Sequence, residues 1–165
     1  MSIALNLPDE ASTCRLGEAL ARAMSAPLLV GLSGDLGVGK TTLVRALINA
    51  VVPGTRVKSP TYTLVETYLL PQGLLHHLDL YRIVDARELT ELGLDELLSS
   101  DAIVLVEWPE KGVPLLPLSD LVITLTHQPQ GRSGQVQAQS ERGRLVLAKL
   151  AQVLLIEGDR SNLSC

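Results

Sequence analysis

Residues 34–41 read Gly-Asp-Leu-Gly-Val-Gly-Lys-Thr, which fits the phosphate-loop pattern G-x-x-x-x-G-K-[ST] at every defined position. An apolar run, Leu28–Leu32, precedes this motif, and apolar residues at helical spacing follow it as far as Val51. The glycines allow successive backbone N–H groups to face one anion, and the N-terminus of a helix adds about half a positive charge. With both flanks in place, a strand–loop–helix unit that binds phosphate is favoured over a chance glycine-rich turn.

Each residue of this loop is therefore a candidate nucleotide contact. Lys40 is predicted to reach the β- and γ-phosphates, and the hydroxyl of Thr41 is predicted to ligate magnesium. The motif predicts these nucleotide-binding residues: Gly34, Asp35, Leu36, Gly37, Val38, Gly39, Lys40 and Thr41.

Two carboxylates are candidate partners for this loop, because magnesium chemistry on phosphates needs acids that position the metal or the attacking water. Glu107 follows the apolar run Ala102–Val106, where a Walker B acid leaves a buried strand; a surface carboxylate past a strand end is the alternative. Asp79 stands in an otherwise apolar stretch. Because an unpaired buried carboxylate is costly, we expect Asp79 to face the site or an arginine such as Arg82, rather than solvent.

Two adjacent histidines precede Asp79 and raise the question of a transition-metal site. In a strand, His77 and Asp79 share a face while His76 points away. No third soft ligand is evident in the sequence, so a structural or substrate-side role for His77 is favoured over a metal ligand.

The segment Ser59-Pro-Thr-Tyr-Thr63 follows the helix of the phosphate loop, a region that often senses the γ-phosphate in related hydrolases. Its hydroxyls could bond a phosphate or the metal's water, and a plain Ser-Pro turn into a strand is an equal alternative. The chain has no Phe, and its one Trp and three Tyr all lie between residues 62 and 108, the stretch that contains both acids. The possible switch or partner contacts are Thr61, Tyr62, Thr63, Tyr81, Arg82 and Trp108.

Strand and helix patterns alternate along the chain without a repeat or a long linker. They predict one α/β domain over residues 1–158 and a loose tail over residues 159–165. The expected fold is a P-loop NTPase-like sandwich, in which helices flank a mixed, largely parallel sheet that ends in a C-terminal hairpin. Helices are expected after the N-cap Asp9 and over residues 43–51, 85–92 and 145–156. Strands are expected at residues 28–32, 62–70, 74–81, 102–106, 121–126 and 135–139.

Charge and cysteine content limit the classes of partner. The net charge of −4 argues against a large direct nucleic-acid footprint, which needs a basic face, and no DNA contact is expected. Cys14 and Cys165 lie far apart and are interpreted as free thiols in a reducing cytosol. No signal-peptide pattern is visible and no apolar run approaches roughly 18 residues, so we expect a cytoplasmic protein without membrane contact.

The base of the nucleotide follows from motifs that the sequence lacks. Neither N-K-x-D nor a D-x-x-G after the phosphate loop occurs, so adenine is favoured over guanine. An arginine-rich lid insert, which a small-molecule kinase would need, is not evident. ATP with Mg²⁺ is therefore the expected ligand.

Four blocks, in this order and spacing, resemble the bacterial TsaE (YjeE) family, the ATPase component of the tRNA threonylcarbamoyladenosine machinery. They are Gly34-Asp-Leu-Gly-Val-Gly-Lys-Thr-Thr42, Ser59-Pro-Thr-Tyr-Thr-Leu-Val-Glu66, His77-Leu-Asp-Leu-Tyr-Arg82 and Val106-Glu-Trp-Pro109. The resemblance runs from about Leu7 to the closing helix. Val38 stands where the family often has Ala, a change that leaves the N–H groups of the loop intact.

The resemblance implies a cytoplasmic ATPase that is needed to form threonylcarbamoyladenosine beside the anticodon of tRNA. It implies that the protein acts with TsaB and TsaD and meets tRNA mainly through them. The acidic charge of this chain is compatible with such a role, because the chain need not bind tRNA tightly if its partners do.

The same resemblance implies roles for individual residues. Lys40 and Thr42 would contact phosphates, Thr41 and Glu107 would hold magnesium, and Asp79 would lie by the γ-phosphate or its attacking water. Lys40, Asp79 and Glu107 are thus the candidate catalytic residues. Two further residues match family positions that line the nucleotide site: Glu10 and Gly131.

Two alternatives to a hydrolysing ATPase remain at the level of sequence. One is an assembly module in which ATP binding alone gates docking, and the other is a small-molecule kinase. No arginine finger is obvious in the chain, so Arg82 or a group from a partner could supply that charge, and the second case would make isolated hydrolysis slow.

Overall fold

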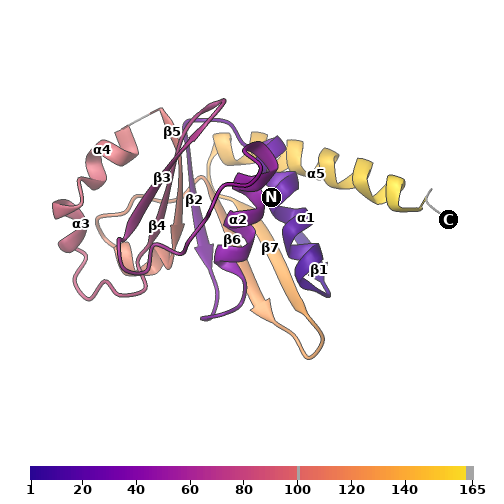
Figure 1. Cartoon of the computed structure of the whole chain (residues 1–165), viewed down its shortest axis with the longest axis horizontal. Helices are drawn as coiled ribbons and strands as arrows, with labels where there is room; N and C mark the ends of the chain where they lie inside the picture. Colours follow the sequence, from indigo (N-terminus) through magenta and orange to yellow (C-terminus); the bar gives the residue numbers. More distant parts are fainter. Residues whose placement is uncertain (100, 163–165) are drawn as a thin grey trace.

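The computed structural model describes residues 1–99 and 101–162, with residues 157–162 as backbone alone. Within these residues, seven strands form one sheet in the order β1-β7-β6-β2-β5-β4-β3 (Figure 1). The strands are β1 (Ser2–Leu7), β2 (Leu28–Ser33), β3 (Val65–Leu70), β4 (Gly73–Asp79), β5 (Ala102–Glu107), β6 (Leu121–His127) and β7 (Arg132–Ala138).

The sheet is mixed, and its parallel part is central. Strand β2 pairs in parallel with β5 and β6, and β4 pairs in parallel with β5. The outer pairs β1–β7, β6–β7 and β3–β4 are antiparallel. Continuous apolar runs form the middle strands because both of their faces are covered. The predicted α/β sandwich with a C-terminal hairpin is confirmed.

Helices cover both faces of the sheet. Helices α1 (Glu10–Ala23), α2 (Lys40–Val51) and α5 (Glu141–Asn162) pack on one face, where leucines of all three join a core with β2, β6 and β7. Short helices α3 (Glu88–Glu91) and α4 (Leu94–Ser99) cover the other face near β4 and β5. In Figure 1, α3 and α4 lie at one end of the sheet, and α5 runs out past the other end.

Close packing of α1 on α2 fixes the position of the helix that carries the phosphate loop. A Cβ atom at Gly17 of α1 would lie 2.5 Å from the carbonyl oxygen of Leu43 in α2, so the helices can approach this closely only at a glycine. Helix α1 begins at the predicted cap, where Asp9 Oδ1 accepts a hydrogen bond of 2.7 Å from the N–H of Ser12. The cap fixes the start of α1, and the close approach at Gly17 holds α2 against it.

Some element boundaries differ from the sequence predictions. Strand β3 begins at Val65 rather than at residue 62, because Leu64 is left-handed (φ 63°) and its N–H donates to the carbonyl of Pro60 in a turn. Strand β4 ends at Asp79 rather than at residue 81, because its carboxylate accepts from the N–H of Tyr81. Helix α3 covers only residues 88–91 of the predicted 85–92, with Glu88 accepting from the N–H of Asp85.

The two ends of the chain show the largest differences. Strand β1 was not predicted, although Ser2–Leu7 alternates between exposed and more buried positions. Helix α5 begins at Glu141, where Ser140 Oγ accepts from the N–H of Gly143, and runs through Asn162. The expected loose tail 159–165 is therefore helical as far as residue 162, and residues 163–165 lie outside the described residues.

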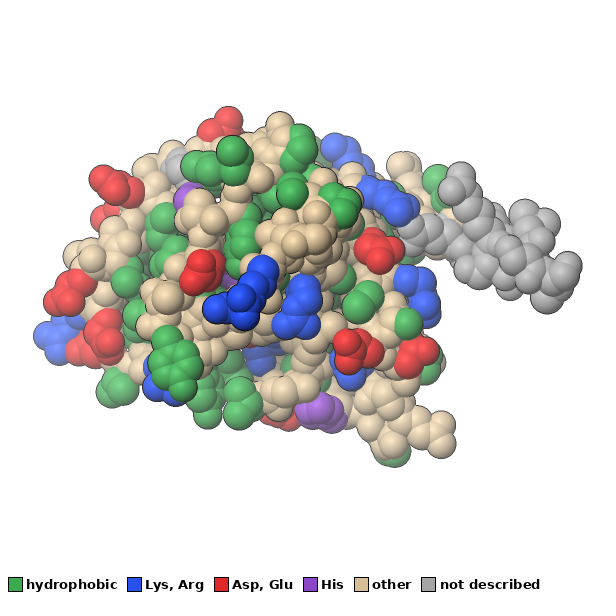
Figure 2. Space-filling view, in the orientation of Figure 1, with side chains coloured by type: hydrophobic (Ala, Val, Ile, Leu, Met, Phe, Trp, Pro, Cys, Tyr) green, Lys and Arg blue, Asp and Glu red, His purple; other side chains and the backbone are tan. Residues whose placement is uncertain are grey.

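The surface carries both signs of charge. On the face drawn in Figure 2, Lys and Arg side chains lie among Asp and Glu rather than in one broad basic patch. No helix in residues 1–99 or 101–162 is both long and apolar enough to cross a membrane.

Candidate nucleotide-binding site

The phosphate loop connects the end of β2 to the start of α2, as predicted. Its three glycines all have positive φ angles: 130° at Gly34, 77° at Gly37 and 113° at Gly39. A Cβ atom at Gly34 would lie 2.2 Å from the carbonyl oxygen of Leu125, and one at Gly39 would lie 2.6 Å from Nη1 of Arg132. The backbone of the loop is thus confined by its neighbours, which pre-organises its N–H groups for an anion.

These glycines allow a matched stability experiment. Gly34→Ala combines a disfavoured φ with a backbone clash, so we expect it to lower the free energy of unfolding by about 2–4 kcal/mol. Gly37→Ala shares the positive φ but meets no atom within 4 Å, so a loss of only about 1–2 kcal/mol is expected. Urea unfolding of the two variants measures both values. Equal losses would show that the contact with Leu125 does not confine the loop.

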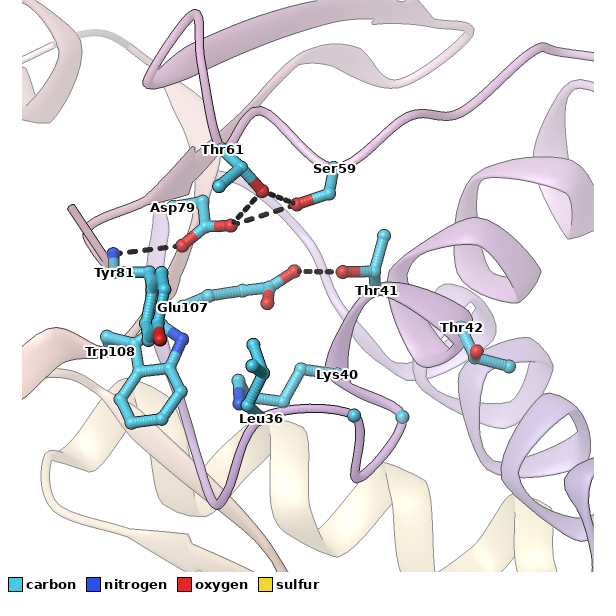
Figure 3. Close-up of a pocket in the computed structure, with 12 residues that line it drawn as sticks. Leu36, Lys40, Thr41, Thr42, Ser59, Thr61, Asp79, Tyr81, Glu107 and Trp108 are labelled. Carbon is cyan, nitrogen blue, oxygen red and sulfur yellow. Dashed lines mark hydrogen bonds between the residues drawn. The ribbon is translucent and has the colours of Figure 1, made fainter.

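A cavity of about 220 Å³ opens beside the loop. Residues from the loop, from the segment 59–63 (the switch segment) and from the ends of β4 and β5 line it, so the acids and the loop meet as predicted (Figure 3). The lining residues are Leu36, Gly37, Gly39, Lys40, Thr41, Thr42, Ser59, Thr61, Asp79, Tyr81, Glu107 and Trp108.

Lys40 is the buried cation of this cavity, with 4% of its surface exposed. Its Nζ donates to the carbonyl oxygens of Gly34 (2.5 Å) and Asp35 (2.9 Å), so the side chain folds back over its own loop. Burial lowers the pKa of the Lys40 ammonium, and the nearby carboxylates of Glu107 and Asp79 act in the opposite direction. An anion in the cavity would find this charge poorly hydrated and already oriented.

The two predicted acids lie side by side on neighbouring parallel strands. Asp79 of β4 is in register with Glu107 of β5, and both side chains are more than nine-tenths buried. Asp79 Oδ2 accepts from Ser59 Oγ (2.9 Å) and Thr61 Oγ1 (3.0 Å), while its Oδ1 accepts from the N–H of Tyr81 (3.0 Å). The switch segment is therefore tied to Asp79 in this structure (Figure 3).

Glu107 instead bonds to the phosphate loop. Its Oε1 accepts a hydrogen bond of 2.8 Å from the hydroxyl of Thr41, the predicted metal-ligating residue. A hydroxyl and a carboxylate are hard oxygen donors, the kind that Mg²⁺ prefers beside phosphates. The two side chains lie together at the rim of a cavity that also holds Lys40, so the residues present fit a magnesium ion.

Aromatic residues close one side of the cavity. The ring of Trp108 lies 4.1 Å from Nζ of Lys40 and 5.2 Å from the ring of Tyr81. Trp108 has a left-handed backbone (φ 59°), a conformation of the kind that accumulates at functional sites. Tyr62 is 82% exposed and Arg82 stacks on its ring at 4.2 Å; neither residue is among those that line the cavity.

A family model described as threonylcarbamoyl adenosine biosynthesis protein TsaE matches residues 7–135, which is well over half of the 165 residues. The chain belongs to the TsaE family. The match includes the phosphate loop, both acids, Trp108 and the hairpin residue Gly131.

Curated members of the TsaE family support this assignment along most of the chain. The tRNA threonylcarbamoyladenosine biosynthesis protein TsaE of Haemophilus influenzae is 36% identical over 152 residues, which cover 89% of this chain and 96% of that protein. The protein of the same description from Nostoc sp. is 36% identical over 131 residues, 76% of this chain and 78% of its own. A crystal structure of Bacillus subtilus YdiB superposes with a TM-score of 0.73 at 24% identity, over 92% of this chain and 94% of that chain, and so shares the fold.

Not every residue implied by the TsaE resemblance lies in the cavity. Thr42 lies at its edge and points away from Asp79 and Glu107 (Figure 3). Glu10 lines a separate hollow between α1 and α2, which Thr42 also borders. Gly131 packs against the backbone of residues 7 and 8, and Val38 is fully buried in the core. Their roles as nucleotide contacts stay predictions.

Two side chains beside the site, His77 and Arg132, are not among the residues predicted to bind the nucleotide or the metal. Nε2 of His77 lies 2.9 Å from Oε1 of Glu107, and the His77 side chain is fully buried. Nη1 of Arg132 donates to Thr13 Oγ1 (3.2 Å) behind Gly39. The period-two pattern of the sequence already places His77 on the face of Asp79, but its contact with Glu107 and the position of Arg132 depend on tertiary packing.

Proposed function

We propose that this TsaE-family chain binds and hydrolyses Mg-ATP in the cytoplasm, and thereby supports threonylcarbamoyladenosine formation next to the anticodon of tRNA together with TsaB and TsaD. The observation that carries the proposal is the meeting of Lys40 and Thr41 of the phosphate loop with the buried acids Asp79 and Glu107 in one cavity. The family and its curated members are named for this tRNA modification. The proposal extends that role to a nucleotide, a reaction and two partners.

The chain's own residues divide the work of phosphoryl transfer to water. Lys40 leaves the carbonyls of Gly34 and Asp35 and neutralises phosphate oxygens. Thr41 and Glu107 hold the magnesium ion, which supplies charge neutralisation when bound. Asp79 orients the attacking water and accepts its proton, once Ser59 and Thr61 release Oδ2.

Slow hydrolysis by the isolated chain follows from the charge around the cavity. Among the described residues that line it, Lys40 is the one that carries a positive side chain. Arg82, the predicted cis candidate for an arginine finger, is engaged with Tyr62 outside this set. A cation supplied by a partner would therefore speed the reaction, by about 10³ to 10⁵ in the best-studied cases.

An assembly module gated by ATP binding alone is the second candidate. The hydrogen bonds from Ser59 and Thr61 to Asp79 favour it, because a nucleotide that displaces this segment would change an exposed surface without any hydrolysis. The two functions differ in whether a variant that binds ATP but does not cleave it supports the modification.

Phosphate release from Mg-ATP tests the proposal. The full chain is assayed alone and with TsaB plus TsaD, with Glu107→Ala as the negative control. We expect slow release that rises at least tenfold with the partners and vanishes in the variant. Unstimulated release despite complex formation, or full tRNA modification by a variant that binds but does not cleave ATP, would favour the binding-gated module. Transfer of phosphate to a metabolite would instead indicate a kinase.

A further inference from the structure

Glu107 has two hydrogen-bond donors on one oxygen. Its Oε1 accepts from the hydroxyl of Thr41 at 2.8 Å and lies 2.9 Å from Nε2 of His77. The proposed function uses Thr41 and Glu107 as magnesium ligands but gives no task to His77. That ring projects from β4 next to β5 and is fully buried, so its contact with Glu107 is shielded from water.

The direction of the hydrogen bond between His77 and Glu107 follows from the chemistry of the carboxylate. An ionised carboxylate only accepts hydrogen bonds, so Nε2 of His77 carries the proton and its N–H donates a hydrogen bond to Glu107. The other ring nitrogen, Nδ1, has no hydrogen-bond partner among the described residues. The tautomer with its proton on Nε2 is therefore the one that leaves no buried N–H unpaired.

The strand register explains why this ring can hold that acid. Asp79 pairs with Glu107 across β4 and β5, and His77 precedes Asp79 by two residues and thus faces the same side. Glu107 is a long side chain at the end of its strand, and a fixed donor reduces the positions that its carboxylate can take. Oxygen ligands of metals commonly depend on such a second hydrogen bond for their orientation.

A role in packing alone does not account for a histidine at this position. Its paired neighbour on β5 is Leu105, and Leu105 and Leu75, which lie on the same face of the sheet, are buried in the core. An apolar side chain would fill the same space without burying a ring nitrogen that has no partner. Burying the unpaired Nδ1 of the imidazole costs stability, and the gain that offsets this cost is the hydrogen bond from Nε2–H to Glu107.

We propose that His77 is the positioning residue of the magnesium site: its Nε2–H holds Oε1 of Glu107 and so aims the carboxylate at the ion beside Thr41. This inference rests on the proposed function, since it deepens the role of Glu107. In this role His77 raises the affinity of the site for Mg²⁺ and does not contact ATP.

Three substitutions at this position separate positioning from packing. His77→Gln places an amide N–H close to the position of Nε2, whereas His77→Asn places one close to Nδ1 and too far from Glu107. His77→Leu keeps the volume and removes every donor. The measurement is the Mg²⁺ concentration that gives half-maximal binding of a non-hydrolysable ATP analogue, followed by the fluorescence of Trp108, whose ring lies 4.1 Å from Nζ of Lys40. The affinity for the analogue in EDTA is measured alongside.

We expect His77→Leu and His77→Asn to raise the required Mg²⁺ concentration about 10- to 100-fold, as is usual for a lost second hydrogen bond to a metal ligand. His77→Gln should stay within about threefold of the unaltered chain, and affinity in EDTA should change little in all three. Equal Mg²⁺ requirements for Gln and Asn, or an unchanged requirement for a folded Leu variant, would overturn the assignment. If the unaltered chain shows no Mg²⁺-dependent binding, the proposed function itself fails.

Discussion

Replacing Lys40 by alanine is expected to weaken binding of ATP about 100- to 10,000-fold, because two charge-assisted hydrogen bonds to the phosphates, worth about 1.5–3 kcal/mol each, are lost. The side chain is 4% exposed and its ammonium bonds two carbonyls of the loop, so it is held beside the loop and exchanges these carbonyls for phosphate oxygens when the nucleotide binds. The backbone N–H groups of the loop remain in the variant, which is why some affinity should persist.

Isothermal titration with ATP and Mg²⁺ measures this loss directly. Lys149→Ala is the matched control, since it removes a lysine from the exposed side of α5. Binding by the Lys149 variant should match that of the unaltered chain. Unchanged affinity in the Lys40 variant would show that the nucleotide does not occupy this cavity.

Replacing Glu107 by alanine is expected to lower Mg-dependent phosphate release at least about 100-fold, because the metal loses its carboxylate ligand where charge develops in the reaction. The variant also removes the acceptor shared by Thr41 and His77. Leaving the buried Nε2–H of His77 unpaired should lower the free energy of unfolding by about 1–3 kcal/mol. Activity must therefore be compared at a temperature where the variant is folded.

The matched control for Glu107 is Glu110→Ala, which removes an exposed carboxylate three residues further along the chain. Phosphate release by this control should stay within a factor of two, and ATP binding in EDTA should stay close to normal in both variants. Release that persists in Glu107→Ala at saturating Mg²⁺ would move the metal site to another acid, with Asp79 the next candidate.

Local patterns predicted the elements that carry the chemistry. The phosphate loop, its flanking strand and helix, and the strand that ends in Glu107 have strong local signals, because apolar runs and glycine spacing act over a few residues. The position of Asp79 and Glu107 at one edge of the sheet also follows from topology, since the carboxyl ends of parallel strands meet there.

The features that sequence analysis did not predict depend on contacts between distant segments. Strand β1 pairs with β7, so its period-two pattern gains meaning only once the C-terminal hairpin is placed. The bond from His77 to Glu107 joins residues on two strands whose register no local pattern specifies. The strand prediction is wrong for residues 62–64, which belong to a turn, because the positive φ falls on Leu64 rather than on a glycine.

The strand order also determines when during synthesis the site can form. Leu28 of β2 pairs with Ile103, Val30 pairs with Leu121, and Ser2 pairs with Gln137. A nascent chain that has just exposed its phosphate loop from the ribosome therefore lacks both neighbours of the strand that supports it. Under the proposed function, we therefore expect ATP to stabilise the chain only after β5 and β6 have emerged and paired with β2.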